Sequence, residues 1–481
     1  MAVVYGSSRG RGPELGFADV LLTGLAPDGG LFLPTTWPSL PESAASLPTS
    51  YVPSSYVDVA TGVIEPFVAG AVEREQLQAI LVDAYDTFDH PDVCPLVQVD
   101  EGHHLMELFH GPTLAFKDVA LQVVGRLFDH ELERRQQRAM IVGATSGDTG
   151  SAAMEAVRGS EHVDIVVLFP HGRTTEVQRR QMTTLSDPNV HAIAIEGTFD
   201  DCQDLVKAMF SDEPFRLRHS LAAVNSINWA RVMVQIVYFV WAVEQLDRGR
   251  QATTFCVPTG NFGNVFSGHV AARMGLNVNR FLVASNRNDV LSRLIETGEM
   301  RAEEVVPTLS PSMDIQISSN LERLLYELLD GNGPATAELI AGFRDHGRAA
   351  LTEVQHQRLT DEFAGDRIDD SETLAIISEV YETHGMLIDP HTAVGVGVAQ
   401  RHRQPGEQIV SLATAHPAKF PDAVEQATGV RPELPARLAD IFDRREDYAV
   451  LPNDLATVEA FVDGLSVDGL SVDGLSVDGL S

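Results

Sequence analysis

The sequence predicts an α/β protein built on largely parallel sheets, with a small N-terminal domain before them. Two patterns carry this prediction. From about Cys94 onward, short apolar and β-branched runs alternate with helical stretches, as in proteins whose parallel strands are covered by helices. The first 92 residues are instead rich in proline and have few sustained apolar periods. A chain of 481 residues also exceeds the size of one simple core, so two or three domains are expected.

The predicted elements follow this division of the chain. Residues 1–92 form the N-terminal domain, in which the clearest element is a helix at about 73–85. Residues 93–435 form the α/β domain. Its predicted strands are residues 139–143, 163–169, 190–195, 253–257, 281–284 and 408–412.

Two further segments have a distinct composition. The apolar stretch at 232–243 is interrupted by Gln235 and is shorter than the roughly 20 residues that span a bilayer. It therefore predicts a buried helix, and no membrane partner is expected. Residues 436–481 are expected to be a C-terminal extension, which ends in four Val-Asp-Gly-Leu-Ser units that begin at Val462. This acidic, low-complexity repeat has no packable face and indicates disorder.

Charge and cysteine usage exclude several classes of function. The net charge of −33 argues against binding nucleic acid or an anionic membrane by general attraction, so an anionic substrate needs a local basic cluster. No charged leader precedes an apolar block at the start, so a cytoplasmic location is expected. The cysteines are few, odd in number and far apart, which favours a reducing compartment over disulfides: Cys94, Cys202 and Cys256. The histidines lack metal-ligand spacing and are interpreted as structural or solvated, so no metal is predicted: His103, His104, His384 and His391.

Lysine is scarce in this chain. Lys117, Lys207 and Lys419 are the only three among 35 basic residues. Arginine retains charge but is a poor amine nucleophile, so a retained lysine is a candidate for Schiff-base chemistry. Lys117 follows a Gly-Pro turn with apolar neighbours, and we expect it to bind a carbonyl cofactor such as pyridoxal phosphate. The alternative, a surface lysine without chemistry, is the better interpretation for Lys207 in its polar-faced helix.

Two glycine-rich loops each follow a predicted strand and precede a helix. They are residues 143–150 and 258–264, the second leading into a predicted helix at 265–274. Backbone N–H groups in such loops bind anions, although a glycine turn at a strand end is often only structural. Neither loop has the lysine of a nucleoside-triphosphate loop or the glycine spacing of a dinucleotide site. Two anion loops with a separate lysine suit a phosphorylated aldehyde cofactor better than a nucleotide.

Two more segments carry candidate polar groups. Asn225, Ser226 and Arg231 begin the long apolar helix and can converge on an oxyanion, with arginine giving a forked contact. The alternative is that Asn-Ser caps the helix and the arginine faces solvent. Thr414 ends the strand at 408–412, and its hydroxyl can hydrogen-bond a pyridine nitrogen. The alternatives here are a turn closed by Pro417, or acid–base roles for His416 and Lys419.

Together with the block Gly24–Pro34, these segments resemble the threonine synthase family, whose members are fold-type II pyridoxal-phosphate enzymes. The resemblance follows the same order and spacing over about residues 3–430. It implies two lobes built on parallel sheets, similar to the tryptophan synthase β subunit, with an extra small N-terminal domain. Residues 93–435 would then be the catalytic domain, in a monomer or homodimer.

The resemblance also implies a reaction and roles for its residues. O-phospho-L-homoserine and water would become L-threonine and phosphate, the last step of threonine biosynthesis. Lys117 would hold pyridoxal phosphate as a Schiff base and then move protons, while Thr414 faces the pyridine nitrogen. The cofactor phosphate would be bound by backbone N–H groups of Gly260, Asn261, Phe262, Gly263 and Asn264. Many relatives carry aspartate at the last position, and backbone binding tolerates that change. The substrate carboxylate would be bound by Ser146, Gly147, Asp148 and Thr149, and its phosphate by Asn225, Ser226 and Arg231.

Two other functions are compatible with these motifs. A related fold-type II enzyme, such as a serine/threonine dehydratase or a threonine-synthase-like phospho-lyase, would release a 2-oxo acid. A cofactor-binding relative without turnover would act as a regulatory module. Arg231 favours a phosphorylated substrate, and the intact Lys117, Thr414 and both loops favour an enzyme. The product, threonine or 2-oxobutanoate, separates the enzymes.

Overall fold

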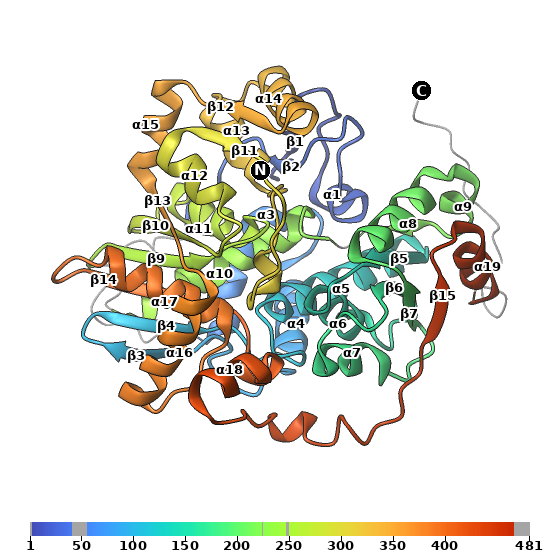
Figure 1. The fold of residues 1–481 in the computed structure, drawn as a ribbon. Coiled ribbons are helices and arrows are strands. Elements are labelled where there is room, and N and C mark those ends of the chain that lie inside the picture. Colours follow the sequence, from blue (N-terminus) through green and yellow to red (C-terminus); the bar gives the residue numbers. More distant parts are fainter. Residues whose placement is uncertain (1, 41–54, 224, 247–249, 466–481) are drawn as a thin grey trace. The chain divides into compact units, whose positions relative to one another are not determined.

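A computed structural model describes residues 2–40, 55–223, 225–246 and 250–465 (Figure 1). The chain forms two compact units, each treated by itself below. Unit 1 comprises residues 1–127 and 225–440, and unit 2 comprises residues 128–224 and 441–481. The domain boundaries predicted after residues 92 and 435 divide the chain differently and stay predictions. The disorder predicted for residues 466–481 lies outside the described residues.

The main sheet of unit 1 has six strands within the described ranges. In sheet order they are β13 (Phe363–Arg367), β10 (Val278–Ser285), β9 (Thr253–Pro258), β14 (Gln408–Ala413), β4 (His103–Glu107) and β3 (Leu96–Asp100). All neighbours are parallel except β3, which is antiparallel to β4. The three strands predicted in this unit are therefore confirmed. The edge strands β13, β3 and the neighbouring β4 were not predicted.

Helices cover both faces of this sheet. Cys256 of β9 belongs to a core cluster with residues of α16 (Asp370–His384) and α17 (Pro390–His402). The adjacent Phe255 points the other way and packs edge-on against Phe239 of α10 (Trp229–Leu246), next to α11 (Gly263–Arg273). Every α10 residue from Trp229 to Glu244 is buried, so the predicted buried helix is confirmed. Among the described residues, no helix is both long and apolar enough to cross a membrane.

The N-terminal segment of unit 1 is more regular than its composition predicts. It contains β1 (Tyr5–Ser7), α1 (Phe17–Thr23), β2 (Phe32–Pro34), α3 (Tyr56–Val68) and α4 (Arg74–Tyr85). The helix predicted at 73–85 is confirmed as α4. The missed helix α3 contains Pro66, yet its buried Val59, Val63 and Phe67 follow helical spacing and pack towards α4 and α10.

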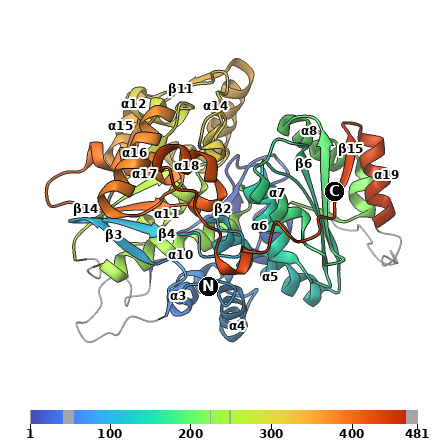
Figure 2. The same cartoon turned by 60° about the horizontal axis from the view of Figure 1, so that its bottom comes forward.

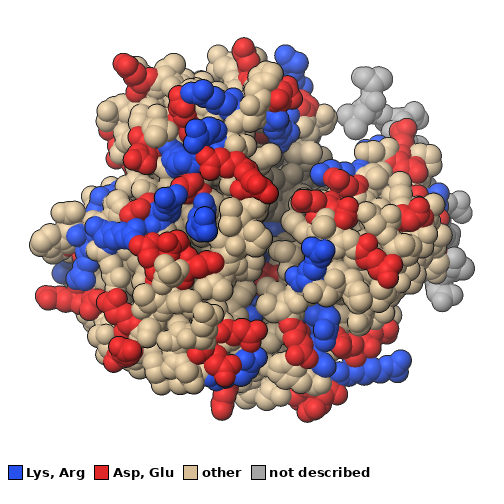
Figure 3. Space-filling model, in the orientation of Figure 1, with Lys and Arg blue, Asp and Glu red and all other residues tan. Residues whose placement is uncertain are grey.

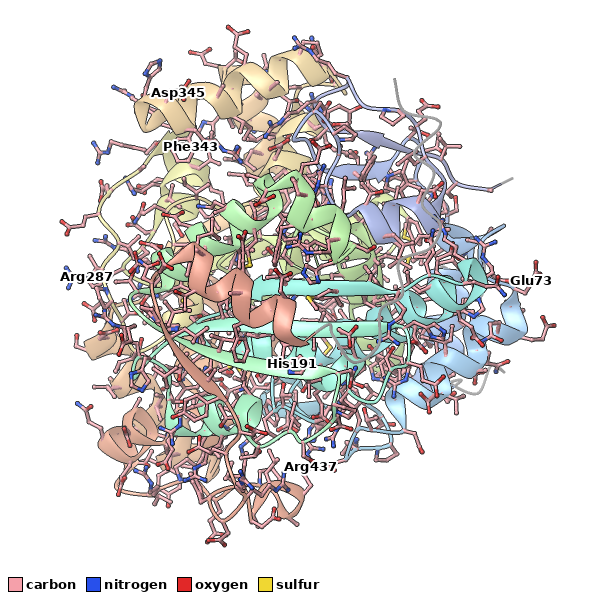
Figure 4. The ribbon with its side chains drawn as sticks, turned by 90° about the vertical axis from the view of Figure 1, so that its right-hand side faces the viewer. Glu73, His191, Arg287, Phe343, Asp345 and Arg437 are labelled. Carbon is pink, nitrogen blue, oxygen red and sulfur yellow. The ribbon has the colours of Figure 1, made fainter. Side chains whose placement is uncertain are left out.

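The rest of unit 1 surrounds these layers. Its elements are the first part of α5 (Lys117–Arg135), α12 (Val290–Thr297), β11 (Glu299–Arg301), α13 (Leu321–Leu328), α14 (Gly333–His346), β12 (Arg348–Ala350), α15 (Glu353–Glu362) and α18 (Pro421–Thr428). Short 3₁₀ turns lie at Pro311–Met313, Pro417–Lys419 and Ala436–Leu438. On α14, Phe343 is buried and Asp345 is exposed, which gives the helix an inner and an outer face (Figure 4).

Unit 2 is built on a sheet whose described neighbours are all parallel. Its order is β15 (Ala449–Pro452), β7 (Val190–Glu196), β6 (Val163–Pro170), β5 (Ala139–Ala144) and β8 (Leu221–Ala222). One face is covered by α8 (Phe199–Ser211) and α19 (Leu455–Leu465), the other by α6 (Asp148–Val157) and α7 (Glu176–Thr183) (Figure 2). The short helix α9 (Glu213–Arg218) follows α8. The three strands predicted here are confirmed.

The C-terminal extension takes part in this fold. Its strand β15 pairs with β7, the strand that carries His191, and α19 lies in front of the sheet (Figure 4). Val462 is fully buried in α19, and Asp463 accepts hydrogen bonds from Arg218 at 3.0 Å and His219 at 2.6 Å. The expectation that the repeat has no packable face is therefore wrong for its first unit. The sheet supplies an apolar partner that the local sequence does not reveal.

A buried charged cluster holds α11 in unit 1. His269 on this helix lies 2.7 Å from Oε1 of Glu362 through Nδ1 and 3.4 Å from Oε2 of Glu327 through Nε2. Glu327 also faces Arg273 and accepts the Trp37 indole N–H. Burial alone would lower the pKa of His269, but the hydrogen bonds and charges of the two carboxylates outweigh it and raise the pKa to about 9.

We predict a pH-dependent stability from this cluster. Because the pKa of His269 is raised on folding, its contribution, on the order of 3 kcal/mol, is complete below about pH 6.5 and is lost as the pH rises through about 9. Urea midpoints at about pH 6 and about pH 9.5 should differ less in His269→Gln than in the parent chain. Exposed His346→Gln is the matched control. An unchanged difference in His269→Gln would contradict the assignment.

Candidate active site

Three neighbouring strands of unit 1 end at one edge of the sheet and lead into the predicted cofactor residues. In parallel strands the carboxyl ends lie together, and this is the edge where α/β sheets bind ligands. Strand β9 leads into residues 260–264, β14 leads directly into Thr414, and β4 leads through residues 108–116 to Lys117. The fold thus brings together all the residues predicted to bind the cofactor.

Backbone pairing fixes Lys117 next to Thr414. The N–H of Phe116 donates to the carbonyl of Thr414 at 2.9 Å, and the N–H of His416 donates to the carbonyl of Leu114 at 3.0 Å. Ala115 and Ala415 form an isolated bridge between these hydrogen bonds. The segment before the lysine therefore runs as a short extra strand along the segment that follows β14.

The environment of Lys117 differs from that of a surface lysine. It is the first residue of α5, its side chain is 9% exposed, and its Nζ lies 4.9 Å from the centre of the Phe116 ring. Lys207 is exposed on α8 and pairs with Asp204 at 2.8 Å, as its polar-faced helix predicts. Only the first of these two amines lies in a sheltered site suited to a covalent bond.

Residues 260–264 form a tight turn into α11. Phe262 has a left-handed backbone conformation, with φ of 61°, and the helix begins at Gly263, two residues earlier than predicted. The N–H groups of a first helical turn have no partner within the helix and favour an anion. Asn264 is buried, and its Oδ1 accepts a hydrogen bond from the Tyr238 hydroxyl at 2.6 Å. Its Nδ2 has no hydrogen-bond partner in the part of the chain that the structure describes.

A segment that the sequence analysis missed holds this turn in place. The hydroxyl of Ser318 donates to the carbonyl of Gly260 at 2.8 Å, and the backbone N–H of Asn320 donates to the carbonyl of Asn261 at 3.0 Å. The side-chain amide of Asn320 donates to both Asn261, at 3.1 Å, and Ser226, at 2.9 Å. One side chain therefore joins the two loops predicted to bind phosphate groups. Its only local signal is a Ser-Ser-Asn run before α13, which is typical of an ordinary helix start.

The residues before α10 do not form the helix cap that the alternative interpretation expects. Helix α10 begins at Trp229, and the side chain of Asn228 accepts the N–H of Ala230 at 3.0 Å. Asn225 and Ser226 lie in the preceding turn, where Asn225 is exposed. Asn228, rather than the Asn-Ser pair, therefore occupies the capping position. The turn is also fastened by Arg323, which donates to the carbonyl of Ile227 at 2.6 Å.

Arg231 is buried, so the interpretation as a solvent-facing arginine is wrong. The residue is 3% exposed, and its Nε and Nη1 atoms have no hydrogen-bond partner among the described residues. Burial lowers the pKa of this guanidinium to about 10. A buried cation without a partner is strongly unfavourable, and an anionic ligand would relieve that cost.

The exposed arginines of this acidic protein behave differently. On the face shown in Figure 3, basic and acidic side chains are interspersed. Surface examples in unit 1 are Arg401 with Asp366 and Arg348 with Glu299, at 3.5 and 2.9 Å. Such pairs satisfy their charges at the surface. Arg231, in contrast, is buried with two nitrogens that have no hydrogen-bond partner among the described residues, which makes it a candidate to bind an anion.

Thr414 and His416, in the segment after β14, are both buried or partly buried. Thr414 is 6% exposed at the strand end. Burial lowers the pKa of His416 to about 4, and its Nδ1 accepts the N–H of Ala418 at 3.1 Å. This histidine is neutral near pH 7 and unsuited to give up a proton there. His391 and His103 are likewise buried and bonded, to Asp389 at 2.8 Å and Ser411 at 2.9 Å.

The predicted carboxylate-binding loop belongs to unit 2. It follows β5 and leads into α6, with Gly147 at φ 143° and Ser146 exposed. The hydroxyl of Thr145 accepts the N–H groups of Gly147 and Gly150, each at 2.9 Å. A side chain on Gly147 would meet Gln178 at 2.5 Å, and Gln178 donates to Asp148 at 2.9 Å. These hydrogen bonds hold the loop in one shape at the start of α6, where the helix dipole favours an anion.

The donor set fits pyridoxal phosphate. A sheltered lysine amine, a threonine hydroxyl beside it and a helix start can hold the aldehyde, the pyridine nitrogen and the phosphate. The Asn264 and Arg231 nitrogens that have no partner within the described ranges are further possible donors to anions. Over the described ranges, no group of three or more histidine, cysteine, aspartate or glutamate residues has a geometry that could hold a metal ion.

Comparisons with known proteins agree with this geometry. The family described as "Threonine synthase N terminus" matches residues 4–85, "Pyridoxal-phosphate dependent enzyme" matches 103–339, and "Threonine synthase, C-terminal" matches 392–462. A threonine synthase of Pseudomonas aeruginosa is 49% identical over 95% of this chain and 97% of its own length. The crystal structure of the threonine synthase of Brucella melitensis with PLP bound has a TM-score of 0.93 and 49% identity, and covers 97% of this chain and 100% of its own. The yeast enzyme has a TM-score of 0.90 and 36% identity, over 96% of this chain and 98% of its own.

Proposed function

This chain belongs to the threonine synthase family, and we propose that it converts O-phospho-L-homoserine and water to L-threonine and phosphate. It is a pyridoxal-phosphate enzyme of fold type II, as the sequence predicts. The observation that carries the proposal is the convergence of Lys117, Thr414 and residues 260–264 at the ends of three adjacent strands. This reaction, in which the phosphate leaves and a hydroxyl is added, would be the last step of threonine biosynthesis.

The cofactor roles are assigned to groups that the fold holds rigidly. Lys117 binds the cofactor aldehyde through its amine, and the hydroxyl of Thr414 hydrogen-bonds the pyridine nitrogen. The N–H groups of the 260–264 turn bind the cofactor phosphate, with Asn264 acting through its backbone. Bound pyridoxal phosphate supplies an electron sink for the carbanions that form next to its ring. The hydrogen bonds from Ser318 and Asn320 support this assignment, because they keep the turn in one shape.

The substrate roles follow from two anion sites. Arg231, with Asn225 and Ser226, binds the substrate phosphate, because its buried guanidinium carries N–H groups that have no acceptor among the described residues. The carboxylate is bound by the loop from Ser146 to Thr149, which is rigid and ends at a helix start.

The chain's own residues then perform the proton transfers. The amine of Lys117 takes a proton from Cα of the substrate and then one from Cβ. It returns one proton to Cγ after the phosphate has left, and one to Cα after the hydroxyl of water has added at Cβ. Arg231 stabilises the negative charge on the phosphate as its bond to Cγ breaks. Water adds at Cβ, and the retained phosphate assists that addition.

Location and assembly complete the proposal. A cytoplasmic location is supported by three buried cysteines without disulfides in the described chain. A monomer or homodimer is proposed, with no nucleic-acid or membrane partner.

A product assay tests the function. Purified protein with pyridoxal phosphate and O-phospho-L-homoserine is expected to release threonine and phosphate in equal amounts. Homoserine without its phosphate is the control and should give neither product. Formation of 2-oxobutanoate in place of threonine would support the dehydratase or phospho-lyase. A cofactor spectrum that changes with substrate but yields no product would support a binding module.

A further inference from the structure

Lys419, the third lysine of the chain, lies in the region around Lys117. Lys419 ends the 3₁₀ turn at Pro417–Lys419, five residues after Thr414, and is fully buried. Its Nζ donates a hydrogen bond of 2.7 Å to the carbonyl of Thr113. A fully buried lysine needs a compensating negative charge.

That charge belongs to Asp118, the residue next to Lys117. Asp118 is fully buried and accepts hydrogen bonds from the Thr113 N–H at 2.8 Å and the Thr113 hydroxyl at 2.7 Å. The charge of Lys419 acts on it directly. Burial raises the pKa of Asp118 to about 6 even with these contacts, so the carboxylate depends on them to stay ionised near pH 7.

Thr113 connects Asp118 and Lys419. It donates to Asp118 through its N–H and hydroxyl, while its carbonyl accepts from Lys419. The turn it closes is tight: a side chain on Gly111 would meet Cβ of Asp118 at 2.4 Å. Leu114, the next residue, has a left-handed φ of 64°, which a leucine adopts only when its surroundings hold it there. The network therefore sets the path of the chain into Lys117.

We propose that Lys419 and Asp118 are a buried pair of positioning residues that, through Thr113, hold the turn at 111–117 so that Lys117 points at its carbonyl partner. The inference deepens the proposed function and rests on it. It also explains why a lysine stands at 419 in a chain whose basic residues are nearly all arginine. A compact ammonium can donate to the Thr113 carbonyl while its charge acts on the Asp118 carboxylate, whereas the planar guanidinium requires a wider site.

The test measures how fast the protein attaches pyridoxal phosphate at Lys117. Apo-protein is mixed with the cofactor, reduced with borohydride at timed intervals, and the labelled peptide is quantified by mass spectrometry. Lys419→Met should attach the cofactor at least about ten-fold more slowly and lose kcat by a similar factor, with KM for O-phospho-L-homoserine within about two-fold. Lys207→Met, at the exposed lysine, is the matched control and should behave as the parent chain.

A milder pair of variants keeps the test independent of folding. Thr113→Val removes the hydroxyl that donates to Asp118 but keeps the shape of the side chain, whereas Thr113→Ser keeps the hydroxyl. The valine variant should attach the cofactor about five-fold more slowly and the serine variant at nearly the parent rate. Melting temperatures of the apo-proteins show whether each variant is folded.

Three outcomes would overturn the inference. One is a parent rate of attachment in Lys419→Met or in Thr113→Val. Another is serine behaving like valine at position 113, because the hydroxyl would then have no role. The third is labelling of a residue other than Lys117 in the parent chain. If the parent chain attaches the cofactor at Lys117 but makes no threonine, the proposed function fails while these rates still decide the positioning role.

Discussion

Replacing Lys117 by arginine is expected to abolish threonine formation, with kcat reduced at least about 10⁴-fold. Arginine keeps the positive charge, but its guanidinium forms no stable bond with an aldehyde and releases no proton near neutral pH. The residue is buried at the start of α5, whereas Lys207 is exposed and paired with Asp204, so its amine lies in a different environment and is not expected to replace Lys117.

Three measurements check this expectation. The variant should release no threonine from O-phospho-L-homoserine, should lack the visible absorbance of a lysine-bound cofactor, and should not be labelled by borohydride. Lys207→Arg is the matched control, because it makes the same exchange on the surface of α8. Labelling of another residue in the Lys117→Arg protein, or threonine release near the parent rate, would refute the role of Lys117.

Replacing Arg231 by methionine is expected to lower kcat/KM for O-phospho-L-homoserine by about 100-fold. Arg231 is 3% exposed, and two nitrogens of its guanidinium have no acceptor in the part of the chain that the structure describes. Their hydrogen bonds are therefore available to the phosphate that leaves from Cγ. Cofactor attachment at Lys117 should change little, because the cofactor phosphate is assigned to the 260–264 turn.

The stability of Arg231→Met shows whether Arg231 serves substrate binding or only the fold. Removing a buried charge that has no ion pair with any described residue is expected to leave the free energy of unfolding unchanged or to increase it, even as activity falls. Surface Arg158→Met, which breaks ion pairs with Glu155 and Asp187, should change neither property by much. If Arg231→Met unfolds more easily and keeps its specific activity, the residue serves the fold alone.

Much of the architecture can be predicted from the sequence because its signals are local. The strands at 139–144, 163–170 and 190–196 are apolar runs of strand length, and such runs form buried parallel strands wherever helices separate them. The buried helix α10 is likewise predicted from its apolar sequence, because so long an apolar stretch is unfavourable in contact with water. Segments whose partner is distant were missed: β15 is a strand only because β7 offers it a free edge.

Some residues of the candidate site were also predicted from the sequence, and others were not. Lys117 and Thr414 were identified from their chemistry, and the structure places them side by side. Asn320 was missed because its hydrogen bonds reach residues 59 and 94 positions away along the chain, and a Ser-Ser-Asn run carries no trace of them. The burial of Arg231 was also not predicted, since an arginine one turn into a helix is usually solvated.

The amino-acid sequence by itself determined the α/β class, the family and the one lysine suited to a carbonyl cofactor, because each depends on residue type and short-range order. The tertiary structure alone decided which polar groups are buried and what they bond. Examples are the two Arg231 nitrogens without an acceptor among the described residues, the amide of Asn320 bonded to two loops, and Lys419 bonded to Thr113, which also bonds Asp118. Burial and hydrogen bonding depend on residues far apart in the chain, so they become defined only when the sheet and its helices have assembled.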